Sequence, residues 1–213
     1  MFKEIQETFL LIQLERLVDE AIDHSIRRLR SSGFSLSDED IPKLLNSCLD
    51  MMERCPSHFP SAEETAFQEF YKFFKKYLEE RVWYFVWRLL SLRGVRVKGM
   101  FIADRVGGEG LRSGRPTMGR DIDYLVIVDG DLEEAKAAAR EVEEILNATI
   151  GNRVSELLRR KVNEKVLREC KFFSLVEIDV FANEREARAW APLREIDRSS
   201  YLRVRARELF STL

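Results

Sequence analysis

The chain has 213 residues, and its 35 lysines and arginines against 37 aspartates and glutamates give a formal net charge of −2. Hydrophobic residues make up 45% and charged residues 34%, which excludes a mainly disordered chain, a collagen-like chain and a disulfide scaffold. No stretch of about 18 residues lacks charge, so we expect no membrane helix. The start has no secretory pattern, and the three scattered cysteines form no Cys-x-x-Cys pair. We therefore expect a cytoplasmic protein.

Residues 1–93 are predicted to form a helical region. Apolar residues at three- and four-residue steps predict a first helix that ends at Ser31-Ser32-Gly33. Its expected buried stripe consists of Phe2, Ile5, Phe9, Leu10, Leu14, Leu17, Val18, Ala21, Ile22 and Leu29. A second helix is expected from Ser37 or Asp38 to about Arg54, and a long one from Ser61 to about Leu92. We interpret the many aromatic residues of the long helix as core packing.

Residues 94–213 are predicted to form an α/β domain, of the α+β kind, with a mixed sheet. In chain order we expect a strand at 95–102, a glycine-rich loop at 107–116, a strand at 121–128, a helix at 132–148, a basic helix at 152–169, a strand at 172–181, a short helix at 183–190 and a last helix from about Ser199. The switch from helical to alternating periodicity near Gly94 marks the expected boundary.

Two aspartates stand together in the clearest strand of the chain. Asp121 and Asp123 are two residues apart, so their side chains share one face of the strand. Aspartate is a poor strand former, and two adjacent carboxylates repel each other unless a cation joins them. Mg²⁺ commonly binds one or two carboxylates together with phosphate oxygens. The pair therefore predicts a magnesium site, with Mn²⁺ as an alternative metal.

A third acid stands in the later strand. Asp179 and Glu177 share one face of the expected strand at 172–181. If this strand pairs beside the first, its carboxylate joins the Asp121/Asp123 pair. Three carboxylates on neighbouring strands can hold two Mg²⁺ ions, which is the arrangement that clamps both oxygens of a phosphoryl displacement.

The loop that precedes the aspartate pair carries groups suited to phosphate. Glycines let the backbone approach a ligand and offer amides to phosphate oxygens, and arginine adds charge-assisted hydrogen bonds. The candidate nucleotide-binding residues are Gly107, Gly108, Gly110, Arg112, Ser113 and Gly114.

Together these residues resemble the DNA polymerase β-type nucleotidyltransferase superfamily. Val106-Gly107-Gly108, twelve residues and then Asp121-Ile122-Asp123-Tyr124 are similar to the family's glycine motif and Asp-x-Asp. In a second register, Glu109-Gly110-Leu111-Arg112-Ser113-Gly114 followed by Gly119 is similar to the polymerase run, with Arg120 as one extra residue before the pair. The family's Gly-Ser dipeptide is present in neither register, and the resemblance covers about residues 95–182.

The resemblance implies a mixed sheet with helices on one side and a nucleotidyltransferase site. Asp121, Asp123 and Asp179 would bind magnesium, and Asp179, with Glu177 as the fallback, would accept the proton of the attacking hydroxyl. The expected substrate is a nucleoside triphosphate, ATP first among them. The acceptor is open between a nucleic-acid 3′ end, a small molecule and a protein.

Other readings of the sequence stay open. The chain could be a non-catalytic nucleotide- or partner-binding relative of the fold, in which the N-terminal helices form a homodimer or partner interface. It could also be a toxin–antitoxin nucleotidyltransferase that modifies a protein partner. The seven basic residues of 151–171 are interpreted first as a solvated helix face. The alternative is a nucleic-acid groove with phosphate contacts from Arg153, Arg159, Arg160, Lys161 and Lys165.

Overall fold

The structure is a computed structural model, and it describes residues 2–34, 40, 62–103, 121–158 and 172–197. In these residues the helices are α1 (Phe2–Ser31), α3 (Ala62–Leu92), α4 (Leu132–Leu158) and α6 (Glu184–Trp190). The strands are β1 (Arg96–Ala103), β2 (Ile122–Asp129), β3 (Val176–Phe181) and β4 (Leu193–Glu195). This mixed α+β architecture confirms the expected fold class. The expected helices at 38–54, beyond residue 158 and from Ser199 lie outside the described residues.

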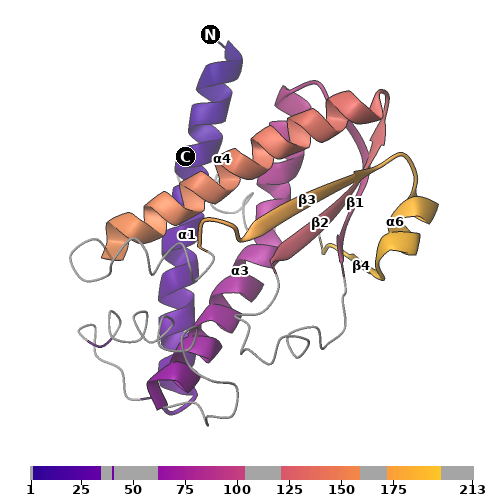
Figure 1. Cartoon of the computed structure of the whole chain (residues 1–213). Coiled ribbons are helices and arrows are strands. Elements are labelled where there is room, and N and C mark those ends of the chain that lie inside the picture. Colours follow the sequence, from indigo (N-terminus) through magenta and orange to yellow (C-terminus); the bar gives the residue numbers. More distant parts are fainter. Residues whose placement is uncertain (1, 35–39, 41–61, 104–120, 159–171, 198–213) are drawn as a thin grey trace.

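The strands form one mixed sheet in the order β3-β2-β1-β4. β1 pairs antiparallel with β2 and with β4, whereas β2 and β3 run parallel. The parallel pair is joined through α4, as a parallel connection requires a crossover. Figure 1 shows α3 and α4 lying against one face of this sheet, and α1 crossing both helices.

One continuous core joins the helices of the first 92 residues to the sheet. It contains Leu14, Phe74 and Leu89 from the helices together with Tyr124 and Val126 of β2, all with no exposed side-chain surface. The expected domain boundary near residue 93 falls at the turn between α3 and β1, where Gly94 has a φ of 86° that favours glycine. The aromatic side chains of α3 are mostly buried in this core, so their interpretation as core packing is confirmed.

The first turns of α1 correct one expectation. Phe2, Ile5 and Phe9 were expected in the buried stripe, but they are 74%, 61% and 58% exposed. With Ile12 they follow each other at three- and four-residue steps, so they form a second apolar stripe on the side of α1 that faces away from the core. Only the stripe from Leu10 onward packs against α3 and α4.

α4 corrects a second expectation. One helix runs through Leu132–Leu158 where two were expected with a break between residues 148 and 152. Gly151 lies inside the helix. A Cβ atom at this position would lie 2.3 Å from the ring of Phe173, so glycine is the residue that fits here. The glycine thus permits a close approach between α4 and the segment before β3 instead of ending the helix. The short β4, which pairs with residues 101–103 of β1, was not expected at all.

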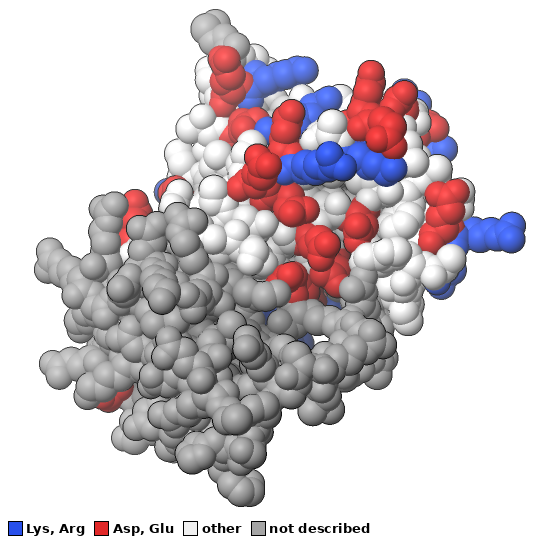
Figure 2. Space-filling view, viewed as in Figure 1, with Lys and Arg blue, Asp and Glu red and all other residues white. Residues whose placement is uncertain are grey.

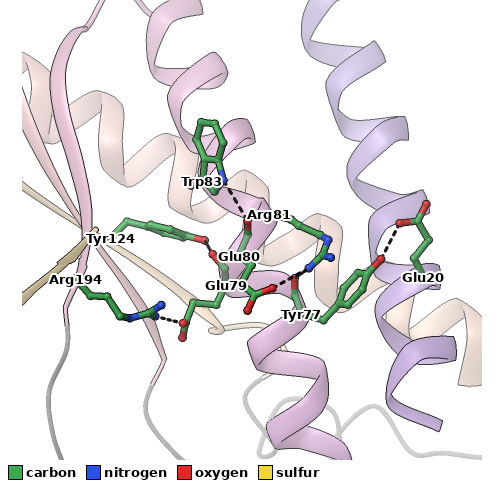
Figure 3. Close-up of polar contacts among 8 residues, drawn as sticks. All are labelled: Glu20, Tyr77, Glu79, Glu80, Arg81, Trp83, Tyr124 and Arg194. Carbon is green, nitrogen blue, oxygen red and sulfur yellow. Dashed lines mark hydrogen bonds and ion pairs between the residues drawn. The ribbon is translucent and has the colours of Figure 1, made fainter. Parts of the chain in front are cut away.

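Polar contacts tie the helices to one another and to the sheet. Figure 3 shows the Tyr124 side chain pointing from β2 to α3, where its hydroxyl donates to the carbonyl oxygen of Glu79 over 2.8 Å. The carboxylate of Glu79 forms an ion pair with Arg194 of β4. Across the helix pair, the Tyr77 hydroxyl of α3 donates to Glu20 of α1 over 3.1 Å. These contacts fix the position of α3 relative to β2 and β4 on one side and to α1 on the other.

Candidate active site

The site begins with the aspartate pair at the start of β2. Asp121 directly precedes the strand and Asp123 is its second residue. The side chain of Asp123 lies on the face opposite α3 and α4, because its neighbours Ile122 and Tyr124 belong to the core beneath the helices. Asp121 stands at the start of the strand. Asp123 is only 6% exposed. Burying a carboxylate to this degree requires compensating charges or hydrogen bonds, so an aspartate at this position of a buried strand is a functional candidate.

β3 brings two further carboxylates to the same face. Asp123 stands directly opposite Glu177, and Leu125 stands opposite Asp179. Residues that pair across two strands share a face, so Asp123, Glu177 and Asp179 lie on one side of adjacent strands, and Asp121 directly precedes β2 at the same end of the sheet. The three acids expected from the sequence thus lie near one another on adjacent strands, although they do not form a cluster that could hold a metal ion by itself. In this register the acid directly opposite Asp123 is Glu177, and Asp179 lies two pairs further along.

The far part of this face is covered by α6. The ring of Trp190 lies 6.1 Å from that of Phe181, and α6 contacts both β2 and β3. Asn183 begins α6 by accepting a hydrogen bond from the Glu186 N–H over 3.0 Å, as expected for a cap. The long helices therefore lie on one side of the sheet as expected, and the short α6 covers the other side beyond the acids.

α4 supplies two site-supporting residues that the sequence analysis missed. Asn147, which is 7% exposed, accepts hydrogen bonds from the N–H groups of Leu175 and Val176 and donates to the Val176 carbonyl. Glu143 accepts from the Ile178 N–H over 3.1 Å. Both side chains therefore pair with the outer edge of β3 and fix the strand that carries Glu177 and Asp179. Their spacing of four within the buried stripe of α4 was the one available signal.

Several carboxylates lie close enough to one another at this end of β2 and β3 to interact electrostatically. Burial raises the pKa of Glu143, against the lowering effect of the Ile178 hydrogen bond, and the charges of Glu177, Asp179 and Asp121 raise it further. On the face shown in Figure 2, acidic side chains lie over α4, where basic side chains stand among them, and over the neighbouring strand β3. Like charges so arranged favour a bound cation.

The topology directs the connecting segments to the same end of the sheet. Ala103 ends β1 beside the start of β2, since Ile102 pairs with Tyr124, and Phe172 leads into the start of β3. The chain therefore leaves β1, enters β2 and enters β3 at the end of the sheet that carries the acids. The expected nucleotide-binding residues Gly107, Gly108, Gly110, Arg112, Ser113 and Gly114 lie outside the described residues, and so do Arg159, Arg160, Lys161 and Lys165.

The donor set suits a hard divalent cation shared with a ligand. Within the described ranges, no three His, Cys, Asp or Glu side chains come together closely enough to hold a metal ion by themselves. Magnesium does not require this, because it is usually bound by one or two carboxylates while phosphate oxygens and water complete its coordination. Asp121 and Asp123, with Glu177 or Asp179 from β3, are the residues that would hold it.

Arg153, one of the candidate nucleic-acid phosphate contacts, instead forms ion pairs within the protein. Its guanidinium binds Asp19 of α1 in a two-pronged ion pair, with Nε–Oδ1 and Nη2–Oδ2 distances of 2.7 and 2.8 Å. It also contacts Glu156 over 3.0 Å. Arg153 therefore joins α1 to α4 and is engaged by two carboxylates, which favours its structural interpretation.

Comparisons with known proteins assign no family to this chain. No family model, curated protein or solved structure matches the chain. Within the part of the chain that the structure describes, no helix is long and apolar enough to cross a membrane.

Proposed function

We propose that the protein is a magnesium-dependent nucleotidyltransferase that moves a nucleoside monophosphate from a nucleoside triphosphate to a hydroxyl acceptor. The observation that carries this proposal is the set of three carboxylates on one face of β2 and β3, from Asp123, Glu177 and Asp179, with Asp121 directly before β2 and Asp123 almost fully buried. The resemblance of Asp121-Ile122-Asp123-Tyr124 and the preceding glycines to the polymerase β-type superfamily supports the same chemistry.

The reaction assigns a role to each acid. Asp121 and Asp123 hold the divalent cations, which when bound neutralise charge on the triphosphate and on the reacting oxygens. The acceptor oxygen forms a bond to the α-phosphorus while the bond from that phosphorus to the pyrophosphate oxygen breaks. The proton of the acceptor hydroxyl passes to the β3 carboxylate, Asp179 or the neighbouring Glu177. Pyrophosphate is the leaving group.

The test compares isosteric carboxamide variants at the acids. Binding of each nucleoside triphosphate is measured by calorimetry in Mg²⁺ and in EDTA for Asp121→Asn, Asp123→Asn, Glu177→Gln and Asp179→Asn. Asp129→Asn is the matched control, because Asp129 ends the same strand and pairs with Lys98 and Arg96 away from the site. We expect metal-dependent binding that the two β2 variants weaken most and the control leaves unchanged. Equal binding by all five variants would contradict the proposal.

A second candidate function rests on the exposed stripe of α1. Phe2, Ile5, Phe9 and Ile12 form an apolar face without cover in the described chain, and such faces are typical of interaction surfaces. A second copy of the chain is the occupant we favour, because the same apolar stripe on two copies can cover each other in a self-complementary contact. Phe9→Glu should then turn a dimer into a monomer in light scattering, and a wild-type monomer at high concentration would exclude this role.

A further inference from the structure

Tyr71 of α3 carries the one hydroxyl in a cluster of phenylalanine rings. Its ring is edge-on to Phe172 at 5.6 Å and tilted against Phe67 at 6.2 Å. Phe70 and Phe74 complete the cluster through their contacts with these two rings and with each other. Tyr71 is 2% exposed, and its hydroxyl oxygen is buried without a hydrogen-bond partner in the described structure. A phenylalanine would fill this position without leaving a polar atom unsatisfied.

The ring of Tyr71 lies at the end of the sheet where β2 and β3 begin. Phe172, which the Tyr71 ring contacts, precedes Leu175, and the carbonyl of Leu175 accepts a 2.7 Å hydrogen bond from the N–H of Ile122. Asp121 is the next residue back from Ile122. Figure 1 shows the start of β2 beside α3, in agreement with the contacts between these elements. Burial raises the pKa of Tyr71, and the charge of Asp121 raises it further, so the Tyr71 hydroxyl stays protonated and can only serve as a donor toward this carboxylate.

An unsatisfied buried hydroxyl costs free energy, whereas a hydrogen bond to a carboxylate is among the stronger ones in proteins. We propose that Tyr71 is a positioning residue for Asp121: its hydroxyl donates to one carboxylate oxygen of Asp121 when the site holds a divalent cation and a nucleotide, which leaves the other oxygen for the cation. This inference rests on the proposed function. It adds α3, from the helical first half of the chain, to the support of the site.

Tyr124 provides a matched comparison. It is also a fully buried tyrosine, but its hydroxyl already donates to the Glu79 carbonyl on the helix face of β2. Removing the two hydroxyls should therefore have opposite effects on the empty protein. Tyr71→Phe should leave the melting temperature unchanged or raise it, because no hydrogen bond is lost. Tyr124→Phe should lower the melting temperature, because a hydrogen bond is lost.

The experiment combines thermal unfolding of the metal-free protein with calorimetric binding of ATP in Mg²⁺. We expect Tyr71→Phe to weaken binding roughly tenfold or more, the usual worth of a hydrogen bond to a charged group. Tyr124→Phe should bind like the wild type. In an Asp121→Asn background the Tyr71→Phe effect should shrink to about twofold or less, because the hydrogen bond to the charged carboxylate is already gone.

The outcomes separate this inference from the proposed function. Wild-type binding that Tyr71→Phe leaves intact would overturn the role of Tyr71 and leave the nucleotidyltransferase proposal standing. A lower melting temperature for metal-free Tyr71→Phe, with unchanged binding, would show a structural hydroxyl and overturn the role as well. Absence of ATP binding by the wild-type protein in Mg²⁺ or Mn²⁺ would overturn both proposals together.

Discussion

Asn147 is the residue whose removal tests most sharply how the structure holds its acidic strand. Its amide makes hydrogen bonds to Leu175 N, Val176 N and Val176 O, of 2.9, 2.9 and 2.8 Å. β3 is the edge strand of the sheet, so these bonds replace those of a neighbouring strand. Asn147→Ala removes all three at once and leaves two N–H groups and one carbonyl without their partner.

The magnitude follows from these three bonds. A typical hydrogen bond contributes about 1 kcal/mol net, and a buried group left unsatisfied costs about 1–3 kcal/mol. Some of the freed edge can take up water, so we expect a loss of about 3 kcal/mol from the free energy of unfolding. For a chain of this size that corresponds to a decrease in melting temperature of roughly 6–12 °C. Because β3 carries Glu177 and Asp179, the variant should also weaken metal-dependent nucleotide binding.

The assay is urea denaturation followed by circular dichroism, with Asn152→Ala as the control. Asn152 lies on the same helix but is exposed, so its removal should change the unfolding free energy by no more than about 0.5 kcal/mol. If Asn147→Ala costs no more than the control, the amide does not hold the edge of β3, and the positioning of the third acid would need another explanation.

Three further predictions concern the surroundings of the site. Gly151→Ala should destabilise the fold by about 1 kcal/mol in urea melts, because the clash with Phe173 outweighs the gain in helix propensity; a stabilised variant would contradict the close approach. A double-mutant cycle on Arg153 and Asp19 should give a coupling of about 1 kcal/mol that falls with added salt, and zero coupling at low salt would contradict the α1–α4 ion pair. The pKa of Glu143 is higher in the folded chain than in the unfolded chain. Folding therefore disfavours the ionised carboxylate, and the free energy of unfolding decreases as the pH rises from the unfolded-state pKa to the folded-state pKa. Glu143→Gln should therefore gain stability over the wild type between pH 4 and pH 7, and a constant difference in unfolding free energy across that range would argue against this.

The elements that could be predicted are those with strong periodicity of their own. The apolar steps of α1 and α3 and the alternation of β2 predicted their bounds to within a few residues. β4 was missed because three residues at 193–195 form a strand only by pairing with β1. The continuity of α4 was missed because Gly151 resembles a helix end until the ring of Phe173 is placed beside it. The first turns of α1 were wrongly predicted to be buried, because an apolar stripe in the sequence does not show which part of it packs against another helix.

The acidic site was predictable to the same degree. The shared face of Asp121 and Asp123 is predicted from alternation alone, and the structure places Asp179 on the face of Asp123 as expected. The pairing of Glu177 opposite Asp123 depends on the register between β2 and β3. These strands are far apart in sequence, so no local sequence pattern predicts that register. Glu143, Asn147 and Tyr71 reach this corner from helices, so only the tertiary packing reveals them.

The most direct test of the central claim is calorimetric titration of ATP and the other nucleoside triphosphates, with Mg²⁺ present or chelated, into the wild-type protein and Asp121→Ala/Asp123→Ala. Retained cooperative unfolding of the double variant is the control for an intact fold. The account predicts metal-dependent binding by the wild type that the double variant loses. Absence of nucleotide binding by the folded wild type with any divalent metal, or undiminished binding by the folded double variant, would contradict it.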